Sequence, residues 1–125
     1  MAGLYLITPD TADTPRLLAQ VTAALSGGGV GVLQYRNKST DAALRLTQAR
    51  ALRQLTLASG TRLVINDDVA LAQAVAADGV HLGREDGELA AARAQLGVDA
   101  WLGASCYADL NLARRAVAAG ASYVA

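Results

Sequence analysis

Short apolar runs alternate with longer amphipathic segments along the chain. The short runs have the length and composition of strands, and they occupy 4–7, 30–33, 63–65, 79–82 and 100–103, with one more beginning at Ser122. The segments between them place apolar residues at helical spacing, and they occupy 14–26, 42–58, 69–77, 87–96 and 110–119. This order predicts parallel βα units with helices packed on the sheet.

Turn and cap residues support these boundaries. Pro15 stands in the first turn of the first predicted helix, and Ser39-Thr40-Asp41 offers an N-cap to the second. Gly60 and Gly97 follow helices that they would end. Because the composition does not change along the chain and no low-complexity linker interrupts it, residues 1–125 are predicted to form a single domain.

Two α/β folds fit this pattern. One is a complete open sheet, and the other is the first five and a half units of a (β/α)8 TIM barrel, which needs about 250 residues when complete. A chain of 125 residues that stops inside its sixth strand would leave an unpaired edge. Polar residues at the end of every predicted strand favour the barrel, whose active sites lie at that rim.

Composition excludes several classes of protein. The chain is formally neutral, which argues against a nucleic-acid partner, and its single cysteine, Cys106, fits a reducing compartment. The start of the chain lacks a signal peptide, and no apolar run approaches the roughly 18 residues of a membrane span. We therefore expect a cytoplasmic protein with small-molecule partners. The sequence leaves open whether it forms a homo-oligomer.

The most informative polar stretch runs from Gln34 to Lys38, directly after an apolar strand. In extended chain, alternate side chains share a face, so Gln34, Arg36 and Lys38 are expected to project together. Two cations beside an amide suit a phosphorylated ligand. The alternative, a strand that runs into a solvated loop, remains open on this segment alone.

Carboxylates follow the next strands at the same rim. Asp67 and Asp86 are candidate ligands for Mg²⁺, which commonly binds one or two carboxylates together with substrate phosphates. Asn66 would be a neutral donor to the ligand. The competing interpretation is that Asp67 or Asp68 caps the helix that follows, and that Asp86 caps the next. His81, inside an apolar strand, is interpreted as a packed core residue.

Several segments together resemble the thiamine phosphate synthase family. They are Leu4-Tyr5-Leu6-Ile7-Thr8, Leu33-Gln34-Tyr35-Arg36-Asn37-Lys38, Ile65-Asn66-Asp67-Asp68-Val69, Asp78-Gly79-Val80-His81-Leu82-Gly83-Arg84-Glu85-Asp86 and Gly103-Ala104-Ser105-Cys106-Tyr107. The resemblance implies a TIM barrel that joins a hydroxymethylpyrimidine diphosphate to a thiazole phosphate and releases pyrophosphate. It further implies that the pyrimidine diphosphate is bound by Gln34, Tyr35, Arg36, Asn37, Lys38, Asn66 and Ser105, and Mg²⁺ by Asp67 and Asp86.

The chain departs from the family pattern in two segments. The usual Arg-Glu-Lys reads Arg36-Asn37-Lys38, and the common Asn-Asp-Arg reads Asn66-Asp67-Asp68. The family's later loops, with a pyrophosphate-binding lysine and the thiazole phosphate site, would follow Ala125. We therefore expect a portion of a longer protein that is inactive by itself, rather than a half-barrel that dimerises.

Two other functions compete with the synthase. A thiazole tautomerase shares the barrel but carries a catalytic histidine where this chain has Ser105-Cys106-Tyr107. A non-catalytic barrel that only binds a diphosphate is the other, and the presence of both Asp67 and Asp86 argues against it.

Overall fold

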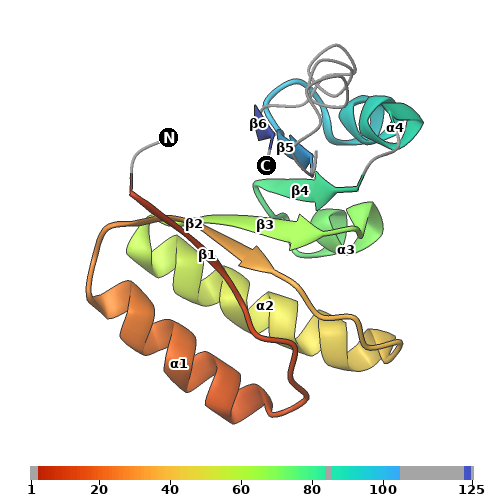
Figure 1. Cartoon of the computed structure of the whole chain (residues 1–125). Coiled ribbons are helices and arrows are strands. Elements are labelled where there is room, and N and C mark those ends of the chain that lie inside the picture. The colour runs from red at the N-terminus through yellow and green to blue at the C-terminus, as the bar shows by residue number, and fades with distance from the viewer. Residues whose placement is uncertain (1–2, 84–85, 105–122, 125) are drawn as a thin grey trace.

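Within the described part of the chain, six strands form one parallel sheet whose order follows the sequence, β1-β2-β3-β4-β5-β6 (Figure 1). The computed structural model describes residues 3–83, 86–104 and 123–124, without the side chains of 86–88 and 123–124. The strands are β1 (Leu4–Ile7), β2 (Val30–Tyr35), β3 (Arg62–Asn66), β4 (Gly79–Leu82), β5 (Trp101–Ala104) and β6 (Tyr123–Val124). The helices are α1 (Thr14–Ser26), α2 (Ala42–Ser59), α3 (Val69–Ala74) and α4 (Asp86–Leu96). Sequential parallel order is that of a βα barrel, whereas a doubly wound sheet reverses its order at a switch point.

Most predicted elements are confirmed, and two boundaries differ in an informative way. β2 continues to Tyr35, beyond the predicted end at Leu33. The predicted helix 69–77 is too long, because α3 ends at Ala74. Ala76 adopts a left-handed backbone (φ 53°), and the Ala77 amide then donates to the Ala72 carbonyl at 2.9 Å, which closes the helix. The predicted helix 110–119 lies outside the described residues.

Aspartates begin three of the helices. The side chains of Asp13, Asp41 and Asp68 accept hydrogen bonds from the amides three residues later, at 3.1, 3.0 and 2.9 Å. Each bond satisfies one of the amides that a helix start leaves without an internal partner. Gly60 ends α2 in a left-handed conformation (φ 71°), the position where glycine carries no side-chain penalty.

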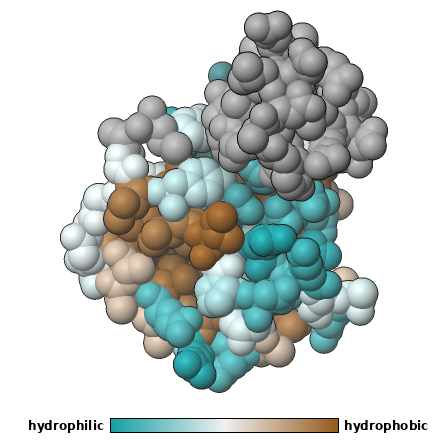
Figure 2. All heavy atoms as spheres, viewed as in Figure 1, coloured by the Kyte–Doolittle hydropathy of each residue, from teal (hydrophilic) through white to brown (hydrophobic). Residues whose placement is uncertain are grey.

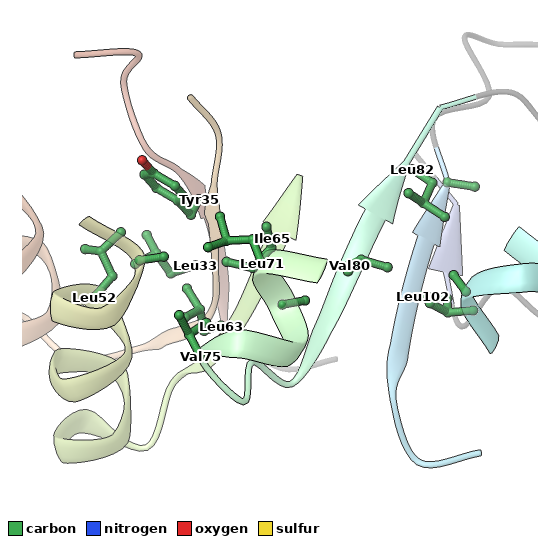
Figure 3. Packing of buried hydrophobic residues seen from close by; sticks show 14 of the residues in the cluster. Leu33, Tyr35, Leu52, Leu63, Ile65, Leu71, Val75, Val80, Leu82 and Leu102 are labelled. Atoms are coloured by element: carbon green, nitrogen blue, oxygen red, sulfur yellow. The ribbon is translucent and has the colours of Figure 1, made fainter. Parts of the chain in front are cut away.

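One face of the sheet packs against the helices through apolar side chains. Figure 3 shows Leu33 and Tyr35 of β2 on the same side as Leu52 of α2, with Ile65 of β3 close to Leu71 of α3. The strand residues of this core alternate along each strand, and they are Leu33, Tyr35, Leu63, Ile65, Val80, Leu82, Leu102 and Ala104. Because successive side chains in a strand point to opposite faces, the residues between them project to the other face.

The face away from the helices carries polar groups toward the carboxyl ends of its strands. Gln34 pairs in register with Val64, and Asn66 pairs with His81. On this face β1 contributes Ile7, which pairs in register with Gln34 and is 55% exposed. Figure 2 shows apolar side chains gathered on the face of the molecule that β1 crosses in Figure 1. Polar chemistry is therefore concentrated where the strands end.

Gly79 permits a close approach between β4 and β5. A Cβ added at this position would lie 1.9 Å from the Trp101 carbonyl oxygen, a distance that no side chain tolerates. The Trp101 ring lies beneath the Arg62 guanidinium, at 4.0 Å from its centroid, in a cation–π contact that reaches from β3 to β5. Gly79 thus fixes the spacing on which this contact depends.

Replacing Gly79 by alanine should destabilise the fold. The new methyl group meets backbone atoms rather than a mobile side chain, so the free energy of unfolding should fall by at least about 1–3 kcal/mol, the usual cost of overpacking. Urea denaturation of Gly79→Ala measures this loss. Gly83→Ala is the matched control, because a Cβ there meets nothing within 4 Å. Equal stability of the two variants would contradict the steric argument.

Candidate functional site

The loops that follow β1 and β2 are held together by hydrogen bonds that backbone amides of one loop donate to side chains of the other. The buried Thr8 hydroxyl accepts a hydrogen bond from the Arg36 amide at 3.0 Å. Asp10 Oδ2 accepts one from the Lys38 amide at 3.2 Å. These bonds fix the backbone at the two residues whose cationic side chains were predicted to bind a phosphorylated ligand.

A cavity of about 230 Å³ opens between these loops. It is lined by Thr8, Asp10, Arg36 and Lys38. The guanidinium and the ammonium can form charge-assisted hydrogen bonds to phosphate oxygens, whereas one Asp10 oxygen is already engaged by the Lys38 amide. The cavity therefore suits an anion of phosphate type.

Gln34 lies on the same face as this cavity but deeper. Its side chain is buried, and its Nε2 donates to the Tyr5 hydroxyl on β1 at 2.8 Å. Asn66, the last residue of β3, is half-buried. The predicted alternation holds for this segment, since Gln34 points to the face opposite the helices and Tyr35 belongs to the helix-side core.

The side chains of Tyr35 and Asn37 bind protein groups on the helix side. The Tyr35 hydroxyl donates to Gln48 Oε1 on α2 at 2.6 Å. Asn37 Nδ2 donates to the same oxygen at 3.0 Å and to the Thr11 carbonyl at 3.1 Å. These positions do not support the expectation that both side chains contact a substrate directly, and they indicate that the two residues anchor the loop.

Asp67 and Asp68 have different partners although they are neighbours. Asp68 caps α3 through Oδ1 and forms an ion pair with Arg45 of α2 through Oδ2. Asp67 adopts a left-handed backbone (φ 57°), and its amide donates to the His81 carbonyl at 2.8 Å. Among the described residues, its exposed carboxylate receives only a long contact, 3.5 Å, from Asn66 Nδ2. The helix cap is therefore Asp68, and Asp67 presents its oxygens at the ends of the strands.

His81 is buried on the same face, as predicted, and reports on the charges around it. Burial lowers its pKa, the nearby Asp67 carboxylate acts in the opposite direction, and the Arg36 guanidinium lowers it further. Groups from β2, β3 and β4 thus lie within electrostatic reach of one another. The structure brings together Gln34, Arg36, Asn66 and Asp67 at one end of the sheet.

The residues present fit a hard divalent cation in part. Asp67 offers carboxylate oxygens of the kind Mg²⁺ prefers. Asp86 begins α4 soon after β4, but its side chain lies outside the described residues, as do Arg84, Glu85 and Ser105. Among the described residues, no group of three or more His, Cys, Asp or Glu side chains could hold a metal alone. If each strand end supplies only one carboxylate, oxygens of the bound ligand would be needed to complete the coordination shell of the cation.

Sequence reasoning left three residues out of the proposed site. Thr8 and Asp10 follow the first predicted strand, yet their side-chain bonds to the neighbouring loop could not be predicted. Gln48 was missed altogether. Its spacing from Leu44 and Leu52, four residues either way, puts it on the buried face of α2 and could have identified it.

The fold and the site define a class of protein, a βα barrel with a cavity lined by two cationic residues at the carboxyl ends of its strands. Residues 4–125 match the family model described as Thiamine monophosphate synthase. The chain belongs to this family.

Known relatives of the chain agree with one another. The chain is 58% identical over 123 residues to the thiamine-phosphate synthase of Chromobacterium violaceum and 61% identical over 123 residues to that of Xanthomonas campestris pv. campestris, covering 98% of this chain each time. It spans 59% and 58% of the length of these relatives. A solved structure, the thiamine phosphate pyrophosphorylase of Pyrococcus furiosus, superposes with a TM-score of 0.82 at 34% identity, over 98% of this chain and 58% of that one. The predicted fold class, the first part of a TIM barrel, is confirmed.

Among the described residues, no helix has both the length and the apolar character needed to cross a membrane.

The Tyr35 hydroxyl provides a pH test of the loop anchor. Burial raises the pKa of Tyr35, while its hydrogen-bonding neighbour Asn37 acts in the opposite direction. Because the pKa is raised, the protonated Tyr35 hydroxyl stabilises the fold fully below pH 10, the ordinary tyrosine pKa. This stabilisation is lost as the pH rises through the pKa of Tyr35 in the folded protein. The absorbance of the Tyr35 tyrosinate is measured as the difference between the parent protein and Tyr35→Phe. This difference should therefore appear only above pH 10.

Unfolding measurements give a second check on the same variant. At pH 8, the free energy of unfolding of Tyr35→Phe should be lower than that of the parent by about 0.5–1.5 kcal/mol, the usual contribution of one hydrogen bond. This deficit should shrink as the parent loses its phenolic proton. A difference absorbance that titrates at or below pH 10 would contradict the buried position.

Proposed function

We propose that the whole protein carrying this chain is a thiamine phosphate synthase. It would transfer the pyrimidine group of 4-amino-2-methyl-5-hydroxymethylpyrimidine diphosphate to a thiazole phosphate and form thiamine phosphate and pyrophosphate. Membership of the family and the names of the relatives support this reaction. It is assigned to the whole protein because the chain spans 58–59% of those relatives.

The observation that carries the proposal is the cavity lined by Thr8, Asp10, Arg36 and Lys38. We assign to it the diphosphate of the pyrimidine substrate, with Gln34 and Asn66 beside it and Ser105 as a further contact. Arg36 and Lys38 would stabilise negative charge as it develops on the departing pyrophosphate, since fixed cations need no reorganisation during the reaction. Tyr35 and Asn37 would contribute through the position of the loop.

We further propose that Asp67 and Asp86 hold Mg²⁺. The exposed carboxylate of Asp67 at the end of β3 supports this assignment, and the Asp68 carboxylate is excluded from it by the bonds to α3 and Arg45. When bound, the cation would neutralise charge on the phosphate oxygens.

The reaction itself is tested by incubating the whole protein with both substrates and Mg²⁺. Thiamine phosphate and pyrophosphate should form in equal amounts. Binding of the pyrimidine diphosphate without any product would overturn the transferase assignment and favour a binding protein.

Replacing Asp67 by asparagine tests the metal assignment without disturbing the backbone, because asparagine also tolerates the left-handed conformation. The apparent Mg²⁺ affinity should fall at least about tenfold, since loss of even an outer partner of a metal ligand costs that much. Turnover measured against Mg²⁺ concentration, together with the melting temperature, reports the effect.

Asp99→Asn is the matched control for Asp67→Asn, because Asp99 is exposed and precedes β5 at the opposite end of the strands. It should leave the Mg²⁺ dependence unchanged. An unaltered Mg²⁺ dependence in Asp67→Asn would remove this residue from the metal site.

Replacing either cationic side chain, Arg36 or Lys38, tests the assignment of the diphosphate to this cavity. Arg36→Ala and Lys38→Ala should each weaken binding of the pyrimidine diphosphate about ten- to a hundredfold, because a hydrogen bond to a charged group contributes roughly 1.5–3 kcal/mol. The affinity for the pyrimidine monophosphate should fall less, and titration calorimetry with both ligands measures the difference. Arg50→Ala, at an exposed position of α2, is the control. Equal losses for the two ligands would indicate a structural role.

A further inference from the structure

Gln48 uses every hydrogen-bonding group of its side chain. Its carbonyl oxygen accepts from the Tyr35 hydroxyl at 2.6 Å and from Asn37 Nδ2 at 3.0 Å. Its amide nitrogen donates to the Thr11 carbonyl at 3.0 Å and to the Thr14 hydroxyl at 3.1 Å. A glutamine offers two acceptor and two donor sites, so none is left for a ligand. The side chain is fully buried.

The four partners are Tyr35 at the end of β2, Asn37 and Thr11 in the two loops that line the cavity, and Thr14 at the start of α1. Tyr35 and Asn37 flank Arg36, so Gln48 binds the side chain of the residue on either side of this cation. Thr11 directly follows Asp10, and its carbonyl accepts from both Gln48 and Asn37. Three of the four cavity residues are therefore adjacent in sequence to a group that Gln48 binds.

Other residues cannot easily replace this arrangement. A glutamate would keep an acceptor for Tyr35 and Asn37 but would turn a carboxylate oxygen toward the Thr11 carbonyl. An apolar residue of similar size would leave the half-buried Thr11 carbonyl and the buried Tyr35 hydroxyl with fewer partners, at a cost that burial increases. A buried polar network of this kind specifies one loop conformation when all its members are satisfied.

We propose that Gln48 is a positioning residue for the diphosphate site: it sets the separation of the β1 and β2 loops and thereby the placement of Arg36 and Lys38. This inference rests on the proposed function for the identity of the ligand. It predicts an effect on the affinity for one substrate, whereas a residue needed only for folding would change the amount of folded protein.

The test compares Gln48→Leu and Gln48→Glu with the parent in the whole protein. In Gln48→Leu, the KM for the pyrimidine diphosphate should rise about ten- to a hundredfold, the range expected when reacting groups are misplaced by about 1 Å. The KM for the thiazole phosphate should change less than twofold. The KM of Gln48→Glu for the pyrimidine diphosphate should lie between those of Gln48→Leu and the parent, since glutamate retains the acceptor for Tyr35 and Asn37.

The matched control is Gln54→Leu, the same exchange at an exposed position of the same helix, which should change neither KM. If circular dichroism shows that Gln48→Leu does not fold, Asn37→Ala replaces it in the test. Asn37 is half-buried, and its substitution removes one hydrogen bond between the loop and Gln48. It should raise the same KM.

The outcomes separate this inference from the proposed function. An active parent whose KM for the diphosphate is unchanged in every folded variant would overturn the positioning role and leave the synthase assignment intact. If the parent forms no product, titration calorimetry with inorganic pyrophosphate replaces turnover, and weaker binding in the variants would still support the positioning role. Unchanged pyrophosphate binding in them would overturn it.

Discussion

The alternation of side chains in extended chain is the constraint on which the site depends. β2 remains extended to Tyr35, and Gln34 and Tyr35 point to opposite faces as a result. A single segment therefore supplies a polar group to the side away from the helices and a hydroxyl to the helix side. A shift of one residue would exchange these roles and direct a buried tyrosine toward the cavity. The parallel register with β3, in which Tyr35 pairs with Ile65, opposes such a shift.

Much of this arrangement could be predicted from the sequence. β1, α1 and β4 have their predicted boundaries because clear turn and cap residues flank them. The end of α3 could not be predicted, since Ala76 adopts a left-handed conformation that favours glycine and carries no such signal. For the site, sequence spacing brought the polar strand ends to one rim. It could not show which of two adjacent aspartates caps the helix, because neither the left-handed backbone of Asp67 nor the ion pair of Asp68 with Arg45 on another helix is visible in the sequence.

Helix α2 contributes to the site without providing a residue that would touch a ligand. Arg45, near its start, neutralises Asp68 beside the proposed metal ligand. Gln48, one turn later, binds the loops of β1 and β2. Arg53, further along, forms an ion pair with Asp78, whose carboxylate also accepts from the Leu63 amide at 2.8 Å. These polar contacts tie the helix to four connections of the sheet, which is why its buried face is not purely apolar.

The same contacts explain the two departures from the family pattern. Where the family usually has glutamate, Asn37 donates hydrogen bonds to Gln48 Oε1 and to the Thr11 carbonyl, which a carboxylate cannot do. Where the family commonly has arginine, Asp68 finds its counter-charge in Arg45 and caps α3 as well. The charge beside Asp67 is therefore compensated locally. Each exchange is matched by a partner on α2, so these positions should be interpreted as pairs, Asn37 with Gln48 and Asp68 with Arg45, because substituting one member alone removes a contact of the other.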